Sequence, residues 1–257
     1  MSTILVTGGT GALGRHVVTG LRDGGHEVRV LSRRPGAGTH HGDLATGAGL
    51  AEAAAGAEMI VHAASDVRRF GRSDVQQTEH LLESARQARH LLYVSIVGID
   101  QIPYAYYRRK LACERKVAAS GIPHTILRAT QFHELLAWLL KSAERLPVAP
   151  LPLDFRFQTV AAADAAARVA ELAGGEPAGG IVNFGGPQVL TLRETAEMWR
   201  AARGLPRRVV RLPLPGAVAR AFREGRNTCP EERSQGQRWE DFVAAGPEVP
   251  YRVKLAP

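Results

Sequence analysis

The fold is decided by the stretch Ile4-Leu5-Val6-Thr7-Gly8-Gly9-Thr10-Gly11-Ala12-Leu13-Gly14-Arg15-His16-Val17-Val18. An apolar run leads into glycines at a spacing of three, Gly8, Gly11 and Gly14, and helical periodicity follows. This order predicts a strand, a tight turn and a helix. Glycines let the backbone approach a ligand closely, and a helix N-terminus presents unpaired N–H groups and a positive dipole. The turn is therefore expected to bind the pyrophosphate of a dinucleotide.

A glycine-rich turn that only packs a helix against a sheet gives the same pattern, so the motif alone is weak. Its position between a strand-like and a helical run favours the dinucleotide. The backbone contacts expected in this turn come from Gly8, Thr10, Gly11, Ala12, Leu13 and Gly14.

The composition of the chain argues against several classes of protein. With 257 residues and 45% hydrophobic content, the chain can form one α/β domain with a substantial core. We see neither a secretory signal nor an apolar run of about 18 residues, so a cytoplasmic protein without membrane contact is expected. Cys113 and Cys229 lack metal-ligand spacing, and no metal is expected. The net charge of +8 is spread along the chain without interleaved aromatics, so we expect no nucleic-acid partner.

The end of the second predicted strand, Val28 to Leu31, bears on the choice of dinucleotide. Ser32-Arg33-Arg34 follows it, without the acidic residue that would bind a free ribose 2′-hydroxyl. Arginine pairs with a 2′-phosphate, so NADP(H) is expected in preference to NAD(H). The alternative is that both arginines are surface charges in water.

Two further strand ends are expected to contact the cofactor. Asp43, followed by Leu44, could lie against the adenine amino group or could cap a helix over residues 47–55. The strand from Met59 ends in Ala63-Ala64-Ser65, whose small side chains would let the cofactor cross the carboxyl end of the sheet. Strands alternating with helices in this rhythm predict a Rossmann-type, doubly wound parallel sheet.

A helix beginning near Tyr104 carries the residues expected to be catalytic. Tyr106 and Lys110 are four residues apart and so share one helix face. A nearby ammonium would lower the pKa of the phenol, which could then donate the proton in a carbonyl reduction. Ser95, at the end of the strand from Leu91, could bind the same carbonyl oxygen. Lys110 could also hold the nicotinamide ribose. The alternative is an accidental pair in a tyrosine-rich helix start.

Together, the glycine turn, Ser95 and the Tyr106/Lys110 pair resemble the short-chain dehydrogenase/reductase superfamily. More narrowly, residues 93–98, 106–111 and 125–133 are similar to the atypical, NmrA-like NAD(P)H-binding branch. That branch includes quinone reductases, isoflavone-reductase-like enzymes and redox sensors that bind the dinucleotide without turnover. The superfamily's asparagine motif is absent, and His62-Ala63-Ala64-Ser65 stands there instead.

The second half of the chain is expected to form a small C-terminal substrate-binding lobe from roughly residues 130–160 and 186–257 of one 257-residue domain. By the resemblance, Ala129, Thr130 and Phe132 would contact the nicotinamide. Phe132 and His133 would then face the substrate, and Trp138 could line an apolar pocket or belong to a core helix.

The sequence thus predicts an NADPH-dependent oxidoreductase acting on a ketone, quinone or activated double bond of a small apolar or aromatic substrate. A non-catalytic, NADP(H)-sensing regulator of the NmrA type is the alternative. A monomer or homodimer is expected in either case.

Overall fold

The computed structural model describes residues 1–34, 36, 38–144, 148–205 and 209–247. Its main sheet has seven strands in the order β3-β2-β1-β4-β5-β6-β9. The pairs of β1 with β2 and β4, of β2 with β3, and of β4 with β5 are parallel. The strands are β1 (Thr3–Thr7), β2 (Glu27–Ser32), β3 (Thr39–His41), β4 (Met59–His62), β5 (His90–Ile96), β6 (His124–Ala129) and β9 (Gly180–Phe184).

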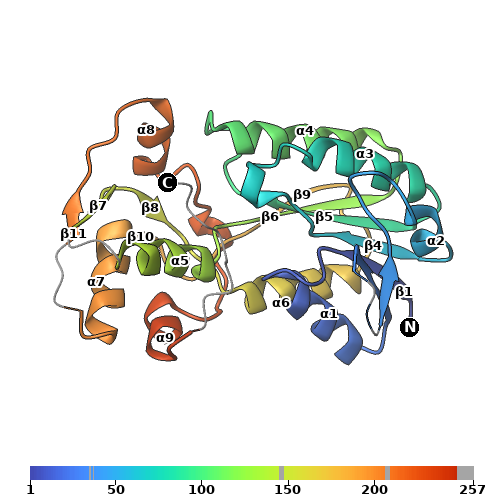
Figure 1. Cartoon of the computed structure of the whole chain (residues 1–257), viewed down its shortest axis with the longest axis horizontal. Helices are drawn as coiled ribbons and strands as arrows, with labels where there is room; N and C mark the ends of the chain where they lie inside the picture. The colour runs from blue at the N-terminus through green and yellow to red at the C-terminus, as the bar shows by residue number, and fades with distance from the viewer. Residues whose placement is uncertain (35, 37, 145–147, 206–208, 248–257) are drawn as a thin grey trace. The chain divides into compact units, whose positions relative to one another are not determined.

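Helices cover both faces of this sheet. In Figure 1, α3 (Asp74–Ser84) and α4 (Ala105–Ala119) lie side by side on one face, and α1 (Gly14–Asp23) and α6 (Ala162–Ala173) lie on the other. The short helix α2 (Leu50–Ala54) and the 3₁₀ turn η1 (Val67–Arg69) complete this part. The predicted doubly wound, Rossmann-type α/β fold is confirmed.

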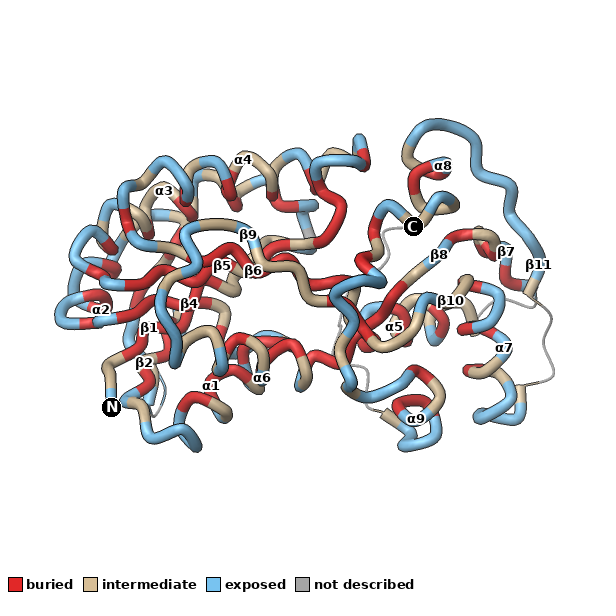
Figure 2. Tube along the Cα trace, turned by 180° about the vertical axis from the view of Figure 1, so that it is seen from behind, coloured by how far each residue is buried: buried red, intermediate tan, exposed pale blue. Residues whose placement is uncertain are grey.

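The central strands form the core of the sheet. Figure 2 shows β1, β4 and β5 buried along most of their length, and Ile4, Ile60 and Leu91 have no exposed surface. Strands that are covered on both faces read as continuous apolar runs, as these do. A buried ion pair joins α4 to β6: Arg128 donates to both carboxylate oxygens of Glu114, at 2.9 and 2.7 Å.

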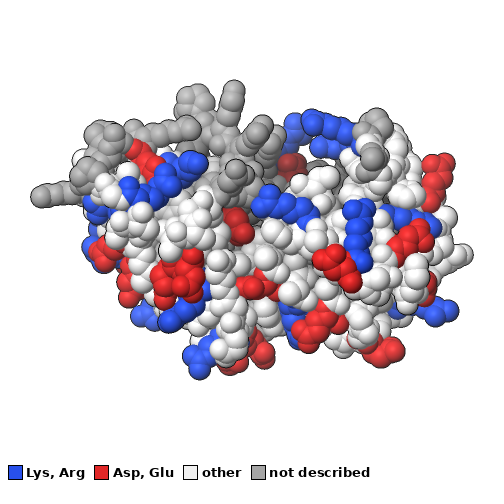
Figure 3. Space-filling model, turned by 90° about the horizontal axis from the view of Figure 1, so that it is seen from below, with Lys and Arg blue, Asp and Glu red and all other residues white. Residues whose placement is uncertain are grey.

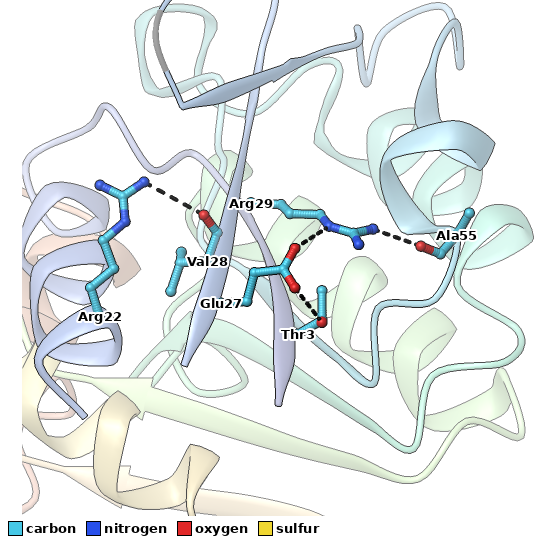
Figure 4. Close-up of polar contacts among 6 residues, drawn as sticks. All are labelled: Thr3, Arg22, Glu27, Val28, Arg29 and Ala55. Carbon is cyan, nitrogen blue, oxygen red and sulfur yellow. Dashed lines mark hydrogen bonds and ion pairs between the residues drawn. The ribbon is translucent and has the colours of Figure 1, made fainter. Parts of the chain in front are cut away.

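Polar contacts hold the amino-terminal ends of β1 and β2 together (Figure 4). Glu27 lies between Thr3 and Arg29, accepting from the threonine hydroxyl at 3.0 Å and from the guanidinium at 3.2 Å. Arg29 also donates to the carbonyl of Ala55 at 2.6 Å. These contacts lie at the opposite ends of the strands from the glycine turn, where Thr3 of β1 pairs with Glu27 of β2.

The chain divides into two compact units. The first comprises residues 1–95, 105–128 and 165–182, and the second comprises residues 96–104, 129–164 and 183–257. The second unit contains the stretches expected for the substrate-binding lobe, roughly residues 130–160 and 186–257. Within these stretches, residues 145–147, 206–208 and 248–257 lie outside the described residues. Its role in binding substrate stays a prediction.

The second unit has its own core around Trp199 and Trp239, each 1% exposed. Thr191 and Glu194 have the spacing that predicts a capping box. The box is present, since the Thr191 side chain accepts from the backbone of Glu194 and Glu194 accepts from the backbone of Thr191. Its remaining elements are α5 (His133–Ala143), β7 (Ala149–Leu151), β8 (Arg156–Phe157), β10 (Leu190–Thr191), α7 (Leu192–Ala202), β11 (Val209–Arg211), α8 (Ala217–Arg223), the 3₁₀ turn η2 (Pro230–Glu232) and α9 (Trp239–Ala244).

Several predicted boundaries were wrong. The apolar spacing of Leu81, Leu82, Ala85 and Ala88 predicts a helix over residues 75–89. The helix ends at Ser84, and Ala85 and Ala88 are buried in the turns that follow it. Successive turns place residues three apart on one side as a helix does, so the apolar spacing alone could not separate them. The helix predicted over 47–55 begins only at Leu50. The sequence Arg156-Phe157-Gln158-Thr159-Val160 predicts a strand, but only Arg156–Phe157 is a regular strand in the structure.

Charge is mixed on the surface seen in Figure 3, where Lys and Arg side chains stand among Asp and Glu. This agrees with the dispersed charge of the sequence, and the expectation of no nucleic-acid partner stays a prediction. Among the described residues, no helix has both the length and the apolar character needed to cross a membrane.

Candidate functional site

The carboxyl ends of four neighbouring strands meet at one edge of the sheet. Thr7, the last residue of β1, pairs with Leu31 of β2 and with His62 of β4, and His62 pairs with Tyr93 of β5. The residues that follow these strands therefore emerge at the same edge. This edge is where open α/β sheets bind their ligands.

The glycine turn at this edge is built without room for side chains. Gly8 has φ +72°, and a Cβ added there would lie 2.7 Å from the backbone nitrogen of Ala64. A Cβ on Gly14 would overlap the carbonyl oxygen of Gly8. Helix α1 starts with no side-chain cap at Leu13 and no acidic residue in its first turn. An uncapped helix start beside a glycine turn fits a phosphate group, because its N–H groups and dipole favour an anion.

A buried histidine supports the turn from the neighbouring strand. The hydroxyl of Thr78 donates to the carbonyl of Asp74 at 2.8 Å, so it accepts from Nε2 of His62 at 3.3 Å. The Nδ1 atom of His62 then accepts from the Thr7 hydroxyl at 2.7 Å. Burial lowers the pKa of His62 to about 3, and the nearby positive charge of Lys110 acts in the same direction. His62 is thus a neutral bridge beneath the residues that begin the glycine turn.

The residues expected to read the adenosine lie after β2 and β3. Arg33 and Arg34 are exposed, and the Ser32 hydroxyl accepts from the backbone N–H of Arg34 at 3.1 Å. Asp43 accepts from the backbone N–H of Ala45 at 2.9 Å, within a turn that precedes α2. The alternative in which Asp43 caps this helix was wrong, because Gly49 holds the cap position without a side-chain bond. A contact from Asp43 or the buried Leu44 to adenine stays a prediction.

Tyr106 lies half-buried in the first turn of α4, and its hydroxyl lies 3.0 Å from the hydroxyl of Ser65. Lys110 follows on the same helix and is 3% exposed. Its ammonium donates to the carbonyl of Val94 at 2.8 Å and lies 4.2 Å from the centre of the Tyr93 ring. Burial lowers the pKa of Lys110, while the negative charge of Asp74 acts to raise it. Tuning of Tyr106 by Lys110 stays a prediction.

The two serines at this edge differ in their surroundings. Ser65 bonds to Tyr106 and donates to the Asp74 carboxylate at 2.6 Å, and the cofactor contacts expected from Ala63, Ala64 and Ser65 stay predictions. The hydroxyl of Ser95 is buried and has no hydrogen-bond partner among the described residues. An unpaired buried hydroxyl is costly unless a ligand satisfies it. Ser95 therefore suits the expected bond to a substrate oxygen.

The sequence-based prediction missed Asp74. An acidic residue at the start of a helix is ordinarily explained by the helix dipole, which hid its second role. The sequence feature that could have indicated this role is the position of Asp74, at the end of the loop that begins with Ser65. In the structure Asp74 is 3% exposed and holds Ser65, as described above.

The residues expected near the nicotinamide and substrate belong to the second unit. Ala129 and Thr130 are buried, and the Thr130 hydroxyl accepts from the backbone of Gly186 at 3.1 Å. Phe132 precedes α5 and, like Trp138, is partly exposed. Contacts from these four residues to a cofactor or substrate stay predictions.

His133 was expected to face the substrate, and the structure corrects this. The ring is fully buried, with Nδ1 2.8 Å from the Thr159 hydroxyl and Nε2 2.9 Å from the carbonyl of Gln237. Trp239 and Phe242 pack against it. Both ring nitrogens are therefore used inside the unit, and His133 is a core residue that joins α5 to the segment before α9.

Comparison with known proteins identifies the class. Residues 8–172 match the family model described as NAD(P)H-binding, which covers more than half of the chain. The chain belongs to this NAD(P)H-binding family. The cofactor class expected from the glycine turn is thereby confirmed, while the choice between NADP(H) and NAD(H) is not decided by this match.

Individual relatives include reductases. A (4-alkanoyl-5-oxo-2,5-dihydrofuran-3-yl)methyl phosphate reductase of Streptomyces griseus is 30% identical over 228 residues, covering 83% of this chain and 78% of that protein. Two solved structures share the fold at low identity. They are a nucleoside-diphosphate-sugar epimerase from Staphylococcus aureus (TM-score 0.77, 18% identity, 94% and 99% of the two chains) and an NADPH-dependent quinone oxidoreductase from Escherichia coli (TM-score 0.76, 19% identity, 94% and 98%).

Proposed function

We propose that this protein is an NADPH-dependent reductase that transfers hydride to a ketone, quinone or activated double bond of a small apolar or aromatic substrate. The observation that carries the proposal is the half-buried phenol of Tyr106, held by Ser65 at the carboxyl edge of a dinucleotide-binding sheet. The reductase from Streptomyces griseus, which this chain resembles over most of its length, supports the reaction class.

The residues of the proposed site form two groups, one that would bind the cofactor and one that would supply the proton. The turn from Gly8 to Gly14 would hold the pyrophosphate, and Arg33 would pair with a 2′-phosphate. The bound NADPH supplies the hydride. The Ser95 hydroxyl, which has no hydrogen-bond partner within the described part of the chain, would donate to the substrate oxygen. Tyr106 would give that oxygen its proton, and the charge of Lys110 would favour the resulting phenolate.

Turnover measurements with a Tyr106→Phe variant test this proposal. The wild-type protein is expected to oxidise NADPH when quinones and ketones are supplied. The variant should lose about 10²- to 10⁴-fold in kcat with little change in NADPH affinity, because only the proton donor is removed. Tyr104→Phe, which removes a hydroxyl two residues away, is the matched control and should keep normal turnover.

Two outcomes would contradict the proposal. Full activity in Tyr106→Phe would remove this phenol from the mechanism. Tight NADPH binding by the wild-type protein, with no substrate-stimulated oxidation across the panel, would instead indicate a dinucleotide sensor.

A further inference from the structure

The loop between β4 and α3 folds around one carboxylate, that of Asp74. One of its oxygens accepts from the Ser65 hydroxyl at 2.6 Å, and the other accepts from the backbone N–H of Asp66 at 2.7 Å. The loop is closed on itself, since the carbonyl of Asp66 accepts from the backbone of Gly71 at 2.8 Å. Ser65 and Asp74 are therefore held in place by the backbone as well as by each other.

This arrangement fixes the direction of the hydrogen bond to Tyr106. A serine hydroxyl has a single hydrogen, and an ionised carboxylate is a stronger acceptor than a phenol. The Ser65 hydrogen therefore goes to Asp74 at 2.6 Å, and the Ser65 oxygen accepts from the Tyr106 hydroxyl at 3.0 Å. The phenol is the donor in this pair.

The loop also packs directly against the tyrosine ring. Gly71 has φ +70°, and a Cβ added there would lie 2.9 Å from Cδ2 of Tyr106 and 3.1 Å from a carboxylate oxygen of Asp74. Only glycine allows the backbone to lie this close to both side chains in a left-handed conformation. Tyr106 is thus fixed at its ring by Gly71 and at its hydroxyl by Ser65.

We infer that Ser65 and Asp74 are positioning residues for Tyr106, which hold its hydroxyl in one orientation and keep it protonated until substrate arrives. The inference rests on the proposed role of Tyr106 as proton donor. It adds which residues orient the Tyr106 hydroxyl. These are Ser65 in the loop after β4 and Asp74 at the start of α3, besides the helix that carries Tyr106 and Lys110.

Other charged and titratable groups surround this chain of hydrogen bonds. Helix α4 contributes Lys110, on which Asp74, Cys113 and Glu114 act electrostatically, and the loop contributes Asp66. Strand β5 contributes Tyr93, whose pKa is raised mainly by burial, with smaller contributions from Cys113, Asp74 and Tyr106. Lys110 favours the phenolate and Asp74 opposes it, so removing the negative charge of Asp74 should make Tyr106 easier to ionise.

The test measures ionisation of Tyr106 directly in the full-length protein. Tyrosine labelled with ¹³C at Cζ reports its own titration by NMR, and Tyr106→Phe assigns the resonance among the five tyrosines. Asp74→Asn should lower the pKa of Tyr106 by about one pH unit or more, the size expected for a nearby charge that is partly screened. Ser65→Ala should also lower it, because the neutral phenol loses its acceptor.

The matched control is Glu79→Gln, which removes a charge from the same helix, α3, at a partly exposed residue paired with Lys116. It should leave the pKa of Tyr106 unchanged. An unchanged titration in Asp74→Asn, or in Ser65→Ala if the first variant does not fold, overturns the positioning role. Failure of the proposed function gives a different result, which is full turnover in Tyr106→Phe. That result does not depend on the titration.

Discussion

Arg33 is the residue on which the preference for NADP(H) depends. It is exposed and follows β2 at the edge where the adenosine ribose is expected. If its guanidinium pairs with the 2′-phosphate, Arg33→Ala should cost about 1.5–3 kcal/mol in NADPH binding, or roughly tenfold or more in Kd. NADH binding should hardly change, because NADH lacks that phosphate.

The measurement is the Kd of each dinucleotide, followed by fluorescence of the reduced nicotinamide. Arg115→Ala removes an equal charge from an exposed residue on α4 and controls for the loss of general attraction. Equal weakening of NADPH and NADH binding, or an unaltered preference in Arg33→Ala, would contradict the assignment.

For single residues, the sequence predicted structure best where the residue type and its spacing have few alternative structural explanations. The placement of Tyr106 and Lys110 on one helix, and of the glycines in a turn before a helix, could be predicted from their spacing, and their roles stay predictions. The contact between Tyr106 and Ser65 joins residues 41 apart in the chain, and no local pattern encodes such a pairing. The burial of His133 was equally hidden, because its partner Gln237 is 104 residues away.

Helix α1 offers a prediction at the scale of an element, because it contains two glycines with opposite surroundings. A Cβ on Gly14 would overlap the backbone of Gly8, so Gly14→Ala must displace the turn. A Cβ on Gly20 would meet only the Cβ of Ala170 at 3.9 Å, an ordinary contact. Gly20→Ala should therefore stabilise the protein by about 0.8–1 kcal/mol, the difference in helix propensity.

Thermal unfolding and NADPH titration separate the two substitutions. We expect a raised Tm and normal affinity for Gly20→Ala, and a lowered Tm with weakened NADPH binding for Gly14→Ala. Normal affinity in a folded Gly14→Ala protein would show that the turn does not hold the pyrophosphate.

The elements also show why boundaries were harder to predict than the elements themselves. The order of strands and helices through β6 follows from alternating apolar runs and glycine stops. Helix α3 was extended too far because Ala85 and Ala88 continue its apolar spacing in two successive turns. Hydrogen bonding, which the sequence pattern does not record, decides where such a segment stops being helical.

For the molecule as a whole, two compact units emerge from segments that alternate along the chain. Composition could not reveal this division, because each unit is assembled from three separate stretches and both have apolar cores. The buried histidines are likewise divided between the units, with His62 and His90 in the first and His133 in the second. Burial lowers the pKa of all three.

These histidines predict how the stability of the whole protein depends on pH. An unfolded histidine has a pKa near 6.5, whereas that of buried His62 is about 3, so the unfolded chain binds more protons between these values. The stabilisation is complete above about pH 6.5 and is lost as the pH falls toward 3. His62 alone should cost about 1.4 kcal/mol for each pH unit in this window, and His90 and His133 act in the same direction.

Urea unfolding at a series of pH values from 7.5 to about 5 tests this expectation. The free energy of unfolding should decrease as the pH falls below about 6.5. In His62→Gln the slope should be shallower by about one proton, because glutamine can bridge hydroxyl groups without titrating. A pH-independent free energy in the wild-type protein, or an unchanged slope in His62→Gln, would mean that His62 is not a neutral bridge between Thr7 and Thr78.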